Sequence, residues 1–219
     1  MEQSVVRPYV GCAGWSLPGP AQQHFPAEGS HLERYASVLP AVEINSSFYR
    51  PHRPATYARW RDSVPPSFRF SVKVPKAITH ELRLQNSDDS LLRFLGEAGN
   101  LEEKLGCLLV QLPPNLPFNA AHASQFFEGL RKHTSVDVVC EPRHRSWFTA
   151  EASELLAQWQ IPYVIADPPV AALPPAHDRQ SGVAYIRLHG SPVMYYSAYS
   201  ETWLDRLAAD IRSRMLRGQ

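Results

Sequence analysis

Short apolar runs recur along the chain, and longer stretches with apolar residues at helical spacing separate them. Short apolar runs bounded by turn residues are typical of buried β-strands, whereas a spacing of three or four residues indicates an amphipathic helix. The strand pattern is found at 8–14, 41–48, 68–75, 106–113, 135–143, 163–169 and 184–190. The helical pattern is found at 30–39, 54–63, 88–104, 119–133, 149–160 and 201–217.

This alternation predicts an α/β fold with parallel strands, either an open doubly wound sheet or a β/α-barrel. An open dinucleotide-binding sheet usually has a glycine-rich turn that leads from its first strand directly into a helix. Here the first strand ends in GCAGWSLPG, where prolines interrupt such a helix. We therefore favour a TIM-type β/α-barrel, expect one domain over residues 1–219, and expect no nucleotide cofactor.

Polar side chains occur late in six of the seven predicted strands, after apolar first halves. They are Glu43 and Asn45, Ser71 and Lys73, Gln111, Glu141 and Arg143, Asp167, and Arg187 and His189. In a parallel barrel the late residues of all strands gather at one end, where the active site lies. For a single strand, a terminal charge that reaches solvent is the simpler interpretation. Six strands with the same pattern favour a shared site.

The segment AVEINSSFY, at 41–49, illustrates the pattern. Val42 and Ile44 alternate with Glu43 and Asn45. If the strand is buried on both faces, the carboxylate and the amide must be paired or used, because an unpaired polar group is costly to bury. We expect the apolar pair to lie under the helices and the polar pair to line the mouth of the barrel.

The carboxylates of this set predict acid–base chemistry. We expect Glu43 and Glu141 to act as general acid and base. Asp167 and His189 would tune or orient them, with His189 a possible proton shuttle. These four are the predicted catalytic residues.

The cations of the set predict an anionic ligand. Lys73, Arg143 and Arg187 are suited to clamp an anionic group. With two carboxylates nearby, we expect Lys73 to be ion-paired and its pKa to be held up, which disfavours a Schiff-base role. Further predicted substrate-binding residues lie at the strand ends or in the loops that follow: Trp15, Asn45, Tyr49, His80, Gln111, Trp147 and Tyr199. Any one of these aromatic residues could instead pack loops over the barrel rim.

Composition narrows the classes of partner. The chain has 22 basic and 21 acidic residues, so nucleic acid is not favoured as a partner. No apolar run approaches the roughly 18 residues of a membrane span, and no leader pattern is present. The cysteines Cys12, Cys107 and Cys140 are odd in number and far apart, which fits a reduced, cytoplasmic protein. With no Cys/His cluster of zinc-site spacing, we predict no metal and no cofactor.

Several segments carry a family resemblance in collinear order: GCAGWS, VEINSSFYR, FRFSVKVPKAITH, LGCLLVQLPP, CEPRHRSWF, AYIRLHG and MYYSAYS. Together they resemble the motifs of the YecE-like family (domain of unknown function 72), from about Val10 to Tyr199. The resemblance implies a TIM-type barrel, in agreement with the alternation, and it implies site positions without an activity.

At its C-terminal end the chain differs from the pattern of this family. Family members usually continue past the last helix into another strand, whereas this chain stops at IRSRMLRGQ. We therefore expect seven parallel strands, with the eighth βα unit missing and the barrel incompletely closed between the first and the seventh strand. Because exposed strand edges attract partners, a homo-oligomer could cover this edge.

Three functions remain open. The first is an enzyme that acts on a small polar or anionic molecule, such as a sugar derivative or a phosphorylated metabolite. The second is a metal-dependent phosphodiesterase or nucleic-acid repair-like enzyme, since carboxylates and histidine can hold metals, although the nearby cations would repel them. The third is a non-catalytic barrel that binds a small ligand. We favour the first, because barrel mouths usually carry catalytic sites.

Overall fold

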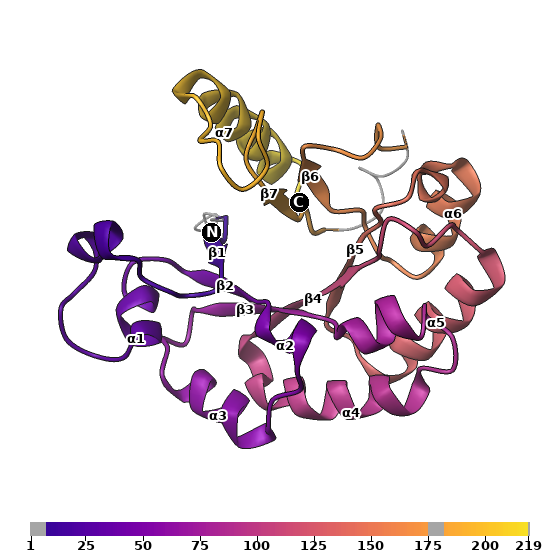
Figure 1. Ribbon diagram of the computed structural model, residues 1–219, viewed down its shortest axis with the longest axis horizontal. Coiled ribbons are helices and arrows are strands. Elements are labelled where there is room, and N and C mark those ends of the chain that lie inside the picture. Colours follow the sequence, from indigo (N-terminus) through magenta and orange to yellow (C-terminus); the bar gives the residue numbers. More distant parts are fainter. Residues whose placement is uncertain (1–7, 175–181, 219) are drawn as a thin grey trace, which may run out of the picture.

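The computed structural model describes residues 8–174 and 182–218. In this part of the chain seven parallel strands are found, five in one sheet of order β1-β2-β3-β4-β5 and two in a separate pair, β6-β7 (Figure 1). Their bounds are β1 (Gly11–Ala13), β2 (Ala41–Ile44), β3 (Arg69–Lys73), β4 (Leu105–Gln111), β5 (Asp137–Glu141), β6 (Ile165–Asp167) and β7 (Ile186–Leu188). Each strand coincides with one of the predicted runs, so the α/β prediction with parallel strands is confirmed.

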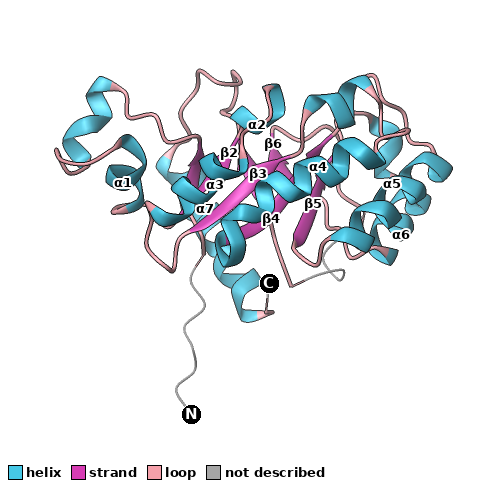
Figure 2. Cartoon of the chain, turned by 90° about the horizontal axis from the view of Figure 1, so that it is seen from below, coloured by secondary structure: helices cyan, strands magenta, loops and turns pink. Residues whose placement is uncertain are grey.

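Helices separate most of the strands and cover the five-stranded sheet mainly from one side. The α-helices are α1 (His31–Ala36), α2 (Ser46–Tyr49), α3 (Pro54–Asp62), α4 (Asp88–Ala98), α5 (Ala120–His133), α6 (Ala150–Gln158) and α7 (Glu201–Leu216). Shorter helical turns are η1 (Gly19–His24), η2 (Ala77–Glu81), η3 (Gly99–Lys104) and η4 (Arg145–Phe148). Figure 2 shows α3 and α4 in front of β3 and β4, whereas α7 lies on the other side of the sheet, beside β6 and β7 (Figure 1). The helices α2, η1, η2 and η4 were not predicted.

Helix starts follow from local sequence. Ser30 forms a capping box before α1, in which its hydroxyl accepts from the Glu33 amide and its own amide donates to the Glu33 carboxylate. Asn119, Thr149 and Ser200 cap α5, α6 and α7 by a single bond each, in which the side-chain oxygen accepts from an amide of the first turn. These caps satisfy amides that have no partner inside the helix.

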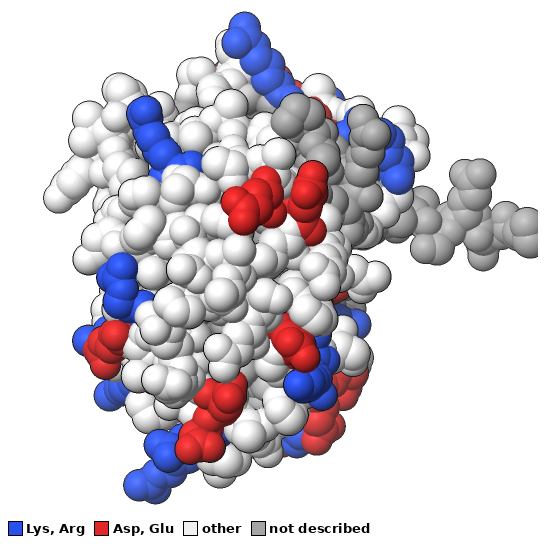
Figure 3. Space-filling model, turned by 90° about the vertical axis from the view of Figure 1, so that its right-hand side faces the viewer, with Lys and Arg blue, Asp and Glu red and all other residues white. Residues whose placement is uncertain are grey.

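The surface carries both signs of charge. On the face seen in Figure 3, acidic and basic side chains are interspersed among neutral ones, and neither sign forms a continuous patch. A strong field of one sign, of the kind that attracts nucleic acid, is therefore not seen on this face. Among the described helices, none is both long enough and apolar enough to span a bilayer.

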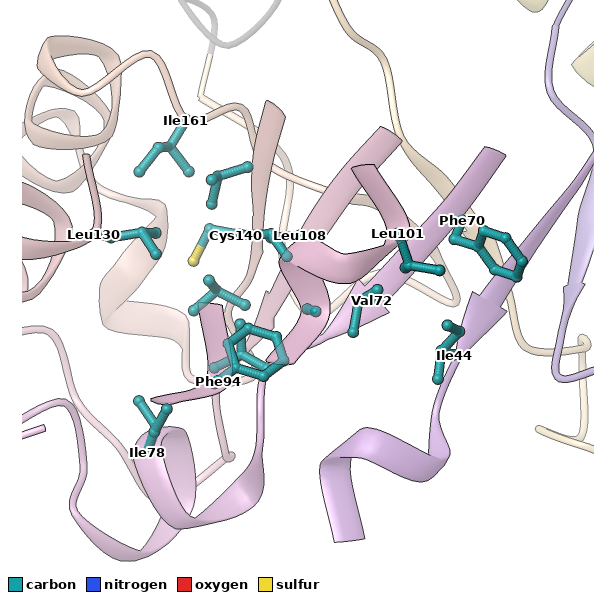
Figure 4. Packing of buried hydrophobic residues seen from close by; sticks show 14 of the residues in the cluster. Ile44, Phe70, Val72, Ile78, Phe94, Leu101, Leu108, Leu130, Cys140 and Ile161 are labelled. Carbon is teal, nitrogen blue, oxygen red and sulfur yellow. The ribbon is translucent and has the colours of Figure 1, made fainter. Parts of the chain in front are cut away.

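The main core lies between the five-stranded sheet and the helices. Alternate strand residues such as Ile44, Val72 and Leu108 are fully buried there, together with Phe94 of α4 and Leu130 of α5 (Figure 4). The residues between them face the other way and form a smaller core of Cys107, Leu109, Val139 and Val164. The central strands are therefore buried on both faces, as parallel strands usually are.

The segment 41–49 behaves as predicted in its first half only. Val42 and Ile44 belong to the helix-side core, and Glu43 is buried on the opposite face. The strand, expected to reach Phe48, ends at Ile44, because α2 begins at Ser46. The Ser47 hydroxyl lies 2.9 Å from the carbonyl oxygen of Ile44 and 2.7 Å from that of Lys73, which holds this helical turn against the end of β3.

The seven strands do not close into a barrel in the part of the chain that the structure describes. Backbone hydrogen bonds join Cys140 of β5 to Pro162 and Val164, at 2.9 and 2.8 Å, so β5 continues toward the β6-β7 pair. No pairing joins β7 to β1 among the described residues, and all three residues of β1 are exposed. What the structure shows is a five-stranded parallel sheet and a two-stranded parallel pair.

Candidate functional site

A buried ion pair joins the two sheets. Arg187 of β7 donates from Nη2 and Nε to the two carboxylate oxygens of Glu43, at 2.8 and 3.0 Å, and from Nη1 to Oε2 of Glu141, at 2.5 Å. All three side chains are more than nine-tenths buried. A guanidinium that forks onto a carboxylate is a strong and directional arrangement. The Arg187 side chain therefore ties β7 to β2 and β5.

His189 and Arg143 complete this group, which we call the ionic cluster: Glu43, Glu141, Arg143, Arg187 and His189. Arg143 Nη2 lies 2.5 Å from Oε1 of Glu141 and 2.9 Å from Nε2 of His189. His189 Nε2 is also 3.4 Å from Oε1 of Glu141. Sequence analysis predicted all five, and the structure brings them together.

The proton on His189 decides which of its contacts forms. Nε2 accepts from Arg143 only when it carries no proton, and it donates to Glu141 only when it carries one. The two contacts therefore exclude each other, and the two tautomers of the neutral ring are enough to exchange them. This makes His189 the one member of the ionic cluster whose hydrogen bonds change with a proton at a stated atom.

Glu141 stays ionised in this setting. Burial alone would raise the pKa of its carboxyl, but a hydrogen bond from His189 and the charges of Arg187 and Arg143 outweigh burial and lower the pKa. A carboxylate with a lowered pKa is a poor general acid. It suits the positioning of the two arginines better than proton donation.

Sequence analysis missed Tyr185. Its hydroxyl donates to Oε2 of Glu43 at 2.9 Å and lies 2.8 Å from Oγ of Ser71. Burial, together with the charge of Glu43, raises the pKa of Tyr185 well above its ordinary value, so the hydroxyl keeps its proton. Tyr185 alternates with Arg187 and His189, so strand periodicity was a signal that could have found it.

Lys73 lies apart from the ion pairs. Its side chain is 8% exposed, and its ammonium lies 4.1 Å from the ring centroid of Phe48. Its ammonium makes no hydrogen bond or ion pair with any described residue, although its carbonyl oxygen accepts from the Ser47 hydroxyl. Burial, with the charge of Arg187, lowers the pKa of Lys73 to about 8, and the opposing effect of Glu43 is smaller. The prediction of an ion-paired lysine with a pKa held up is therefore wrong.

The reason is competition for the carboxylates. Arg187 takes both oxygens of Glu43 and one of Glu141, and Arg143 takes the other oxygen of Glu141. Guanidinium groups match carboxylate geometry better than an ammonium does. Lys73 is left with the aromatic face of Phe48 instead.

The lowered pKa gives a testable pH dependence. The unfolded chain keeps the Lys73 proton up to a pKa of 10.5, but the folded chain releases it near 8. Between these values the unfolded state binds more protons, so this group adds stability as pH rises. Relative to Lys73→Met, the free energy of unfolding of the wild type should therefore gain roughly 3 kcal/mol from about pH 7.5 to about pH 10.5. Urea unfolding at both pH values measures it.

The exposed Lys132 provides the control. The difference between the wild type and Lys132→Met should stay nearly constant over the same range. A Lys73→Met difference that is equally constant would show that the folded ammonium titrates like an ordinary lysine.

Other predicted residues lie near the ionic cluster. Oε1 of Gln111 is 3.4 Å from Nη1 of Arg187. Asp167 accepts a hydrogen bond from the Tyr199 hydroxyl at 2.9 Å, and that hydroxyl in turn accepts from the Gly190 amide at 2.9 Å. Asp167 and Tyr199 thus bind each other at the ends of β6 and β7, beside the backbone of His189, whose amide donates to the carbonyl oxygen of Asp167 at 2.9 Å.

Three more predicted residues contact Phe48, whose ring lies against the Lys73 ammonium. The His80 ring packs edge-on against Phe48, with ring centroids 4.9 Å apart, and burial and the charge of Lys73 lower its pKa. Tyr49 packs edge-on against Phe48 as well, but is 73% exposed. Oδ1 of Asn45 is buried without a partner among the described residues. Phe48 is thus the residue that links this group, and sequence analysis had not selected it.

The two predicted tryptophans lie in packed surroundings. Trp15 packs edge-on against Trp60 of α3, with ring centroids 5.0 Å apart. Trp147 is 1% exposed, and its Nε1 donates to the carbonyl oxygen of Leu116 at 2.9 Å. Neither has a described contact with the ionic cluster or with Lys73.

A cavity of about 340 Å³ borders the ionic cluster. Glu141, Arg143 and Asp167 contribute its polar wall, and most of the remaining wall is apolar, including Trp203 of α7. A pocket of this size and character can hold a small molecule. Lys73 and Glu43 do not line it, so it adjoins the cluster on the side of β6 and β7.

Metal ligands are not grouped in the described part of the chain. No set of three or more His, Cys, Asp or Glu side chains lies close enough there to hold an ion. Glu43 and Glu141, the carboxylates of the cluster, face arginines instead.

Fold and site together define an α/β protein of parallel strands with a buried, partly cationic site at the strand ends. The chain belongs to the family described as "Protein of unknown function DUF72", whose model matches residues 9–219. The resemblance seen in the sequence motifs is therefore confirmed.

Curated relatives are similar over part of their length. The chain is 29% identical to the UPF0759 protein YecE of Escherichia coli (strain K12) over 147 residues, which is 67% of this chain and 52% of that protein. It is 28% identical to the UPF0759 protein YunF of Bacillus subtilis (strain 168) over 150 residues, which is 64% of this chain and 52% of that protein. The chain spans about half the length of these curated relatives.

Solved structures show the same fold. A DUF72 family protein from Thermotoga maritima MSB8 matches with a TM-score of 0.73 at 25% identity, covering 94% of this chain and 88% of that one. A DUF72 family protein from Enterococcus faecalis V583 matches with a TM-score of 0.71 at 21% identity, covering 94% and 83%.

Proposed function

We propose that the protein is an enzyme that binds a small anionic substrate at the carboxyl ends of its parallel strands. The observation that carries this proposal is a surplus of positive charge. Among the charges that act on one another around Lys73, the three cations Lys73, Arg143 and Arg187 face two carboxylates, Glu43 and Glu141, which leaves +1. Asp167 is not among these charges and accepts from Tyr199 instead. The surplus belongs to Lys73, whose ammonium has no anionic partner within the described residues. An anionic ligand would supply it.

The residues would divide the work as follows. Arg187 is already occupied by Glu43 and Glu141, so it positions the site and does not itself clamp the ligand. Arg143 has a buried Nε without a partner among the described residues, and its charge reaches Lys73. Lys73 and Arg143 are therefore the groups proposed to hold the anion. His189 is proposed to move the proton, since its Nε2 is the atom whose contacts depend on protonation.

Calorimetric titration with inorganic phosphate, glycolate, pyruvate and glyoxylate tests this proposal. The wild type should bind at least one of these anions, and Lys73→Met should weaken binding at least tenfold, which corresponds to about 1.4 kcal/mol for one lost charge contact. Lys76→Met is the matched control, because Lys76 is exposed and paired with Glu81. Binding that is absent from the wild type, or equal in the wild type and Lys73→Met, would rule the proposal out.

One observation favours a second candidate, a non-catalytic barrel that binds a small ligand. Both glutamates are fixed by Arg187, so the polar groups form a rigid cradle without a free carboxylate for proton transfer. Nuclear magnetic resonance of the bound anion separates the two: turnover supports the enzyme, and binding without turnover supports the binding protein. The same fixed glutamates give no support to the metal-dependent phosphodiesterase.

We further propose that the fold is an incomplete TIM-type barrel forming a single domain. The strands run in parallel and in chain order, and the hydrogen bonds at Cys140 support continuity from β5 toward β6. A second copy of the chain is proposed to cover the exposed β1 edge, next to the exposed Tyr9 and Val10. Three free cysteines are compatible with a cytoplasmic location.

A further inference from the structure

We propose that Lys73 is a nucleophile that forms a Schiff base with the carbonyl group of the substrate. The substrate class is then narrowed to small anionic aldehydes and ketones, such as 2-oxo acids. This inference rests on the proposed function, because it places the same ligand at the same end of the sheet. It adds a covalent step and a carbonyl requirement that anion binding alone does not need.

Comparison of the four lysines of the chain sets Lys73 apart. Lys76 and Lys132 are exposed and face Glu81 and Glu128, at 3.2 and 3.3 Å. Lys104 is buried, but its ammonium donates to the carbonyl oxygens of Arg61 and Val64, both at 2.7 Å.

Lys73 is as deeply buried as Lys104. Within the described residues, however, its ammonium has neither a carboxylate partner nor a carbonyl acceptor. A buried ammonium without a hydrogen-bond acceptor is costly. Lys73 lies at a strand end that faces the ionic cluster. An uncompensated lysine at this position is suited to act as a reactive amine.

The surroundings of Lys73 favour the neutral amine. Phe48 lies against its ammonium, and its register neighbour on β4 is the fully buried Leu109. Burial and the charge of Arg187 lower the pKa to about 8. Roughly a tenth of the Lys73 side chains is then neutral at pH 7, against about one in three thousand for an ordinary lysine. Desolvation of this kind activates lysine as a nucleophile.

The backbone of Lys73 is held in place. Its carbonyl oxygen accepts a hydrogen bond from the Ser47 hydroxyl at 2.7 Å, which ties the end of β3 to the start of α2. The same helix carries Phe48, so the amine and its aromatic neighbour are positioned together. A reactive group on a fixed strand end meets the geometric demand of covalent catalysis.

The step balances without any oxidant or reductant. The Lys73 nitrogen attacks the carbonyl carbon and forms a C–N bond, giving a carbinolamine. The carbonyl oxygen then leaves as water with two protons from the nitrogen, so ammonium plus carbonyl compound yield an iminium ion plus water. The positive charge stays on nitrogen, and hydrolysis reverses the step. Arg143 is the cation proposed to hold the carboxylate of the 2-oxo acid.

Reductive trapping tests the proposal. The wild-type protein is incubated near pH 7 with pyruvate or glyoxylate and sodium cyanoborohydride, digested at acidic residues, and analysed by mass spectrometry. We expect the reduced carboxyalkyl adduct on Lys73 in at least tenfold excess over Lys76, only three residues away. Lys73→Arg, which keeps the charge but cannot form an imine, should remove the adduct, and Lys76→Arg should not.

Lactate, which has the carboxylate but no carbonyl, distinguishes the two proposals. If lactate binds in a Lys73-dependent way and no Lys73 adduct forms with either carbonyl probe, the Schiff base is wrong and anion binding stands. Equal labelling of Lys73 and Lys76 also overturns the Schiff base, and selectivity within the wild type does not depend on whether a variant folds. If neither an adduct nor anion binding is found, both proposals fail.

Discussion

Replacing Arg187 by methionine is expected to lower the free energy of unfolding by about 3–5 kcal/mol. The guanidinium makes three hydrogen bonds to Glu43 and Glu141, and all three side chains are more than nine-tenths buried. Without it, the Glu43 carboxylate is left in a poorly solvated interior with only the Tyr185 hydroxyl, whereas Glu141 keeps Arg143. Removing one partner of a buried ion pair costs far more than the pair itself contributes, because the remaining charge has no partner. Urea unfolding followed by circular dichroism measures the loss.

Two comparisons show whether uncompensated charge is the cause. Arg206→Met removes an exposed arginine of α7 and should change stability by less than about 0.5 kcal/mol. Combining Arg187→Met with Glu43→Gln removes the carboxylate that has lost its guanidinium, leaves Glu141 paired with Arg143, and should recover most of the lost stability. If Arg187→Met unfolds at the wild-type urea midpoint, the ion pair does not hold β7 to the sheet.

The side of the sheet that a strand residue faces was predicted correctly where alternation alone decides it. Glu43 lies between Val42 and Ile44, so once the strand is buried on both faces, the carboxylate must turn away from the helices. The same parity places Arg187 and His189 on the inner side. It also places Tyr185 there, but sequence analysis considered mainly charged side chains and did not select this hydroxyl.

Pairing within the site could not be predicted in the same way. The sequence offers three cations for two glutamates, and the partners follow from reach and geometry in the folded chain. Arg187, from the β6-β7 pair, binds both carboxylate oxygens of Glu43, and this leaves no oxygen of Glu43 for Lys73. The low pKa of Lys73 thus depends on which cation binds the two glutamates in the folded chain. No local sequence pattern indicates that.

The end of the strand at Ile44 was also missed, because the residues that follow it are ambiguous. Ser46 and Ser47 can continue a strand or begin a helix, and serine side chains often bond to nearby backbone. Ser47 bonds to the carbonyl oxygens of Ile44 and Lys73, and this tertiary contact favours the helical turn. The sequence predicted a gap between the first and the seventh strand, and no pairing joins β7 to β1 among the described residues; it did not predict that β6 and β7 form a separate pair, because that depends on tertiary contacts.

Loop aromatics were the least predictable part of the site, and Trp147 provides the second large expected effect. Trp147→Ala should lower the free energy of unfolding by about 3–5 kcal/mol. Its side chain is 1% exposed, it packs edge-on against Phe118 with ring centroids 5.0 Å apart, and its indole donates to Leu116. Truncation would leave a cavity and an unpaired carbonyl oxygen. Urea unfolding followed by far-ultraviolet circular dichroism measures this without relying on tryptophan fluorescence.

Tyr49 is the matched comparison, because it too is an aromatic residue that follows a strand and was predicted to bind substrate. It is 73% exposed, so Tyr49→Ala should change stability by less than about 0.5 kcal/mol. The two variants therefore separate an aromatic residue that builds the core from one that is free to meet a ligand. Equal stability losses in both would contradict this division, and a weaker anion affinity of Tyr49→Ala alone would support its place beside Phe48 and Lys73.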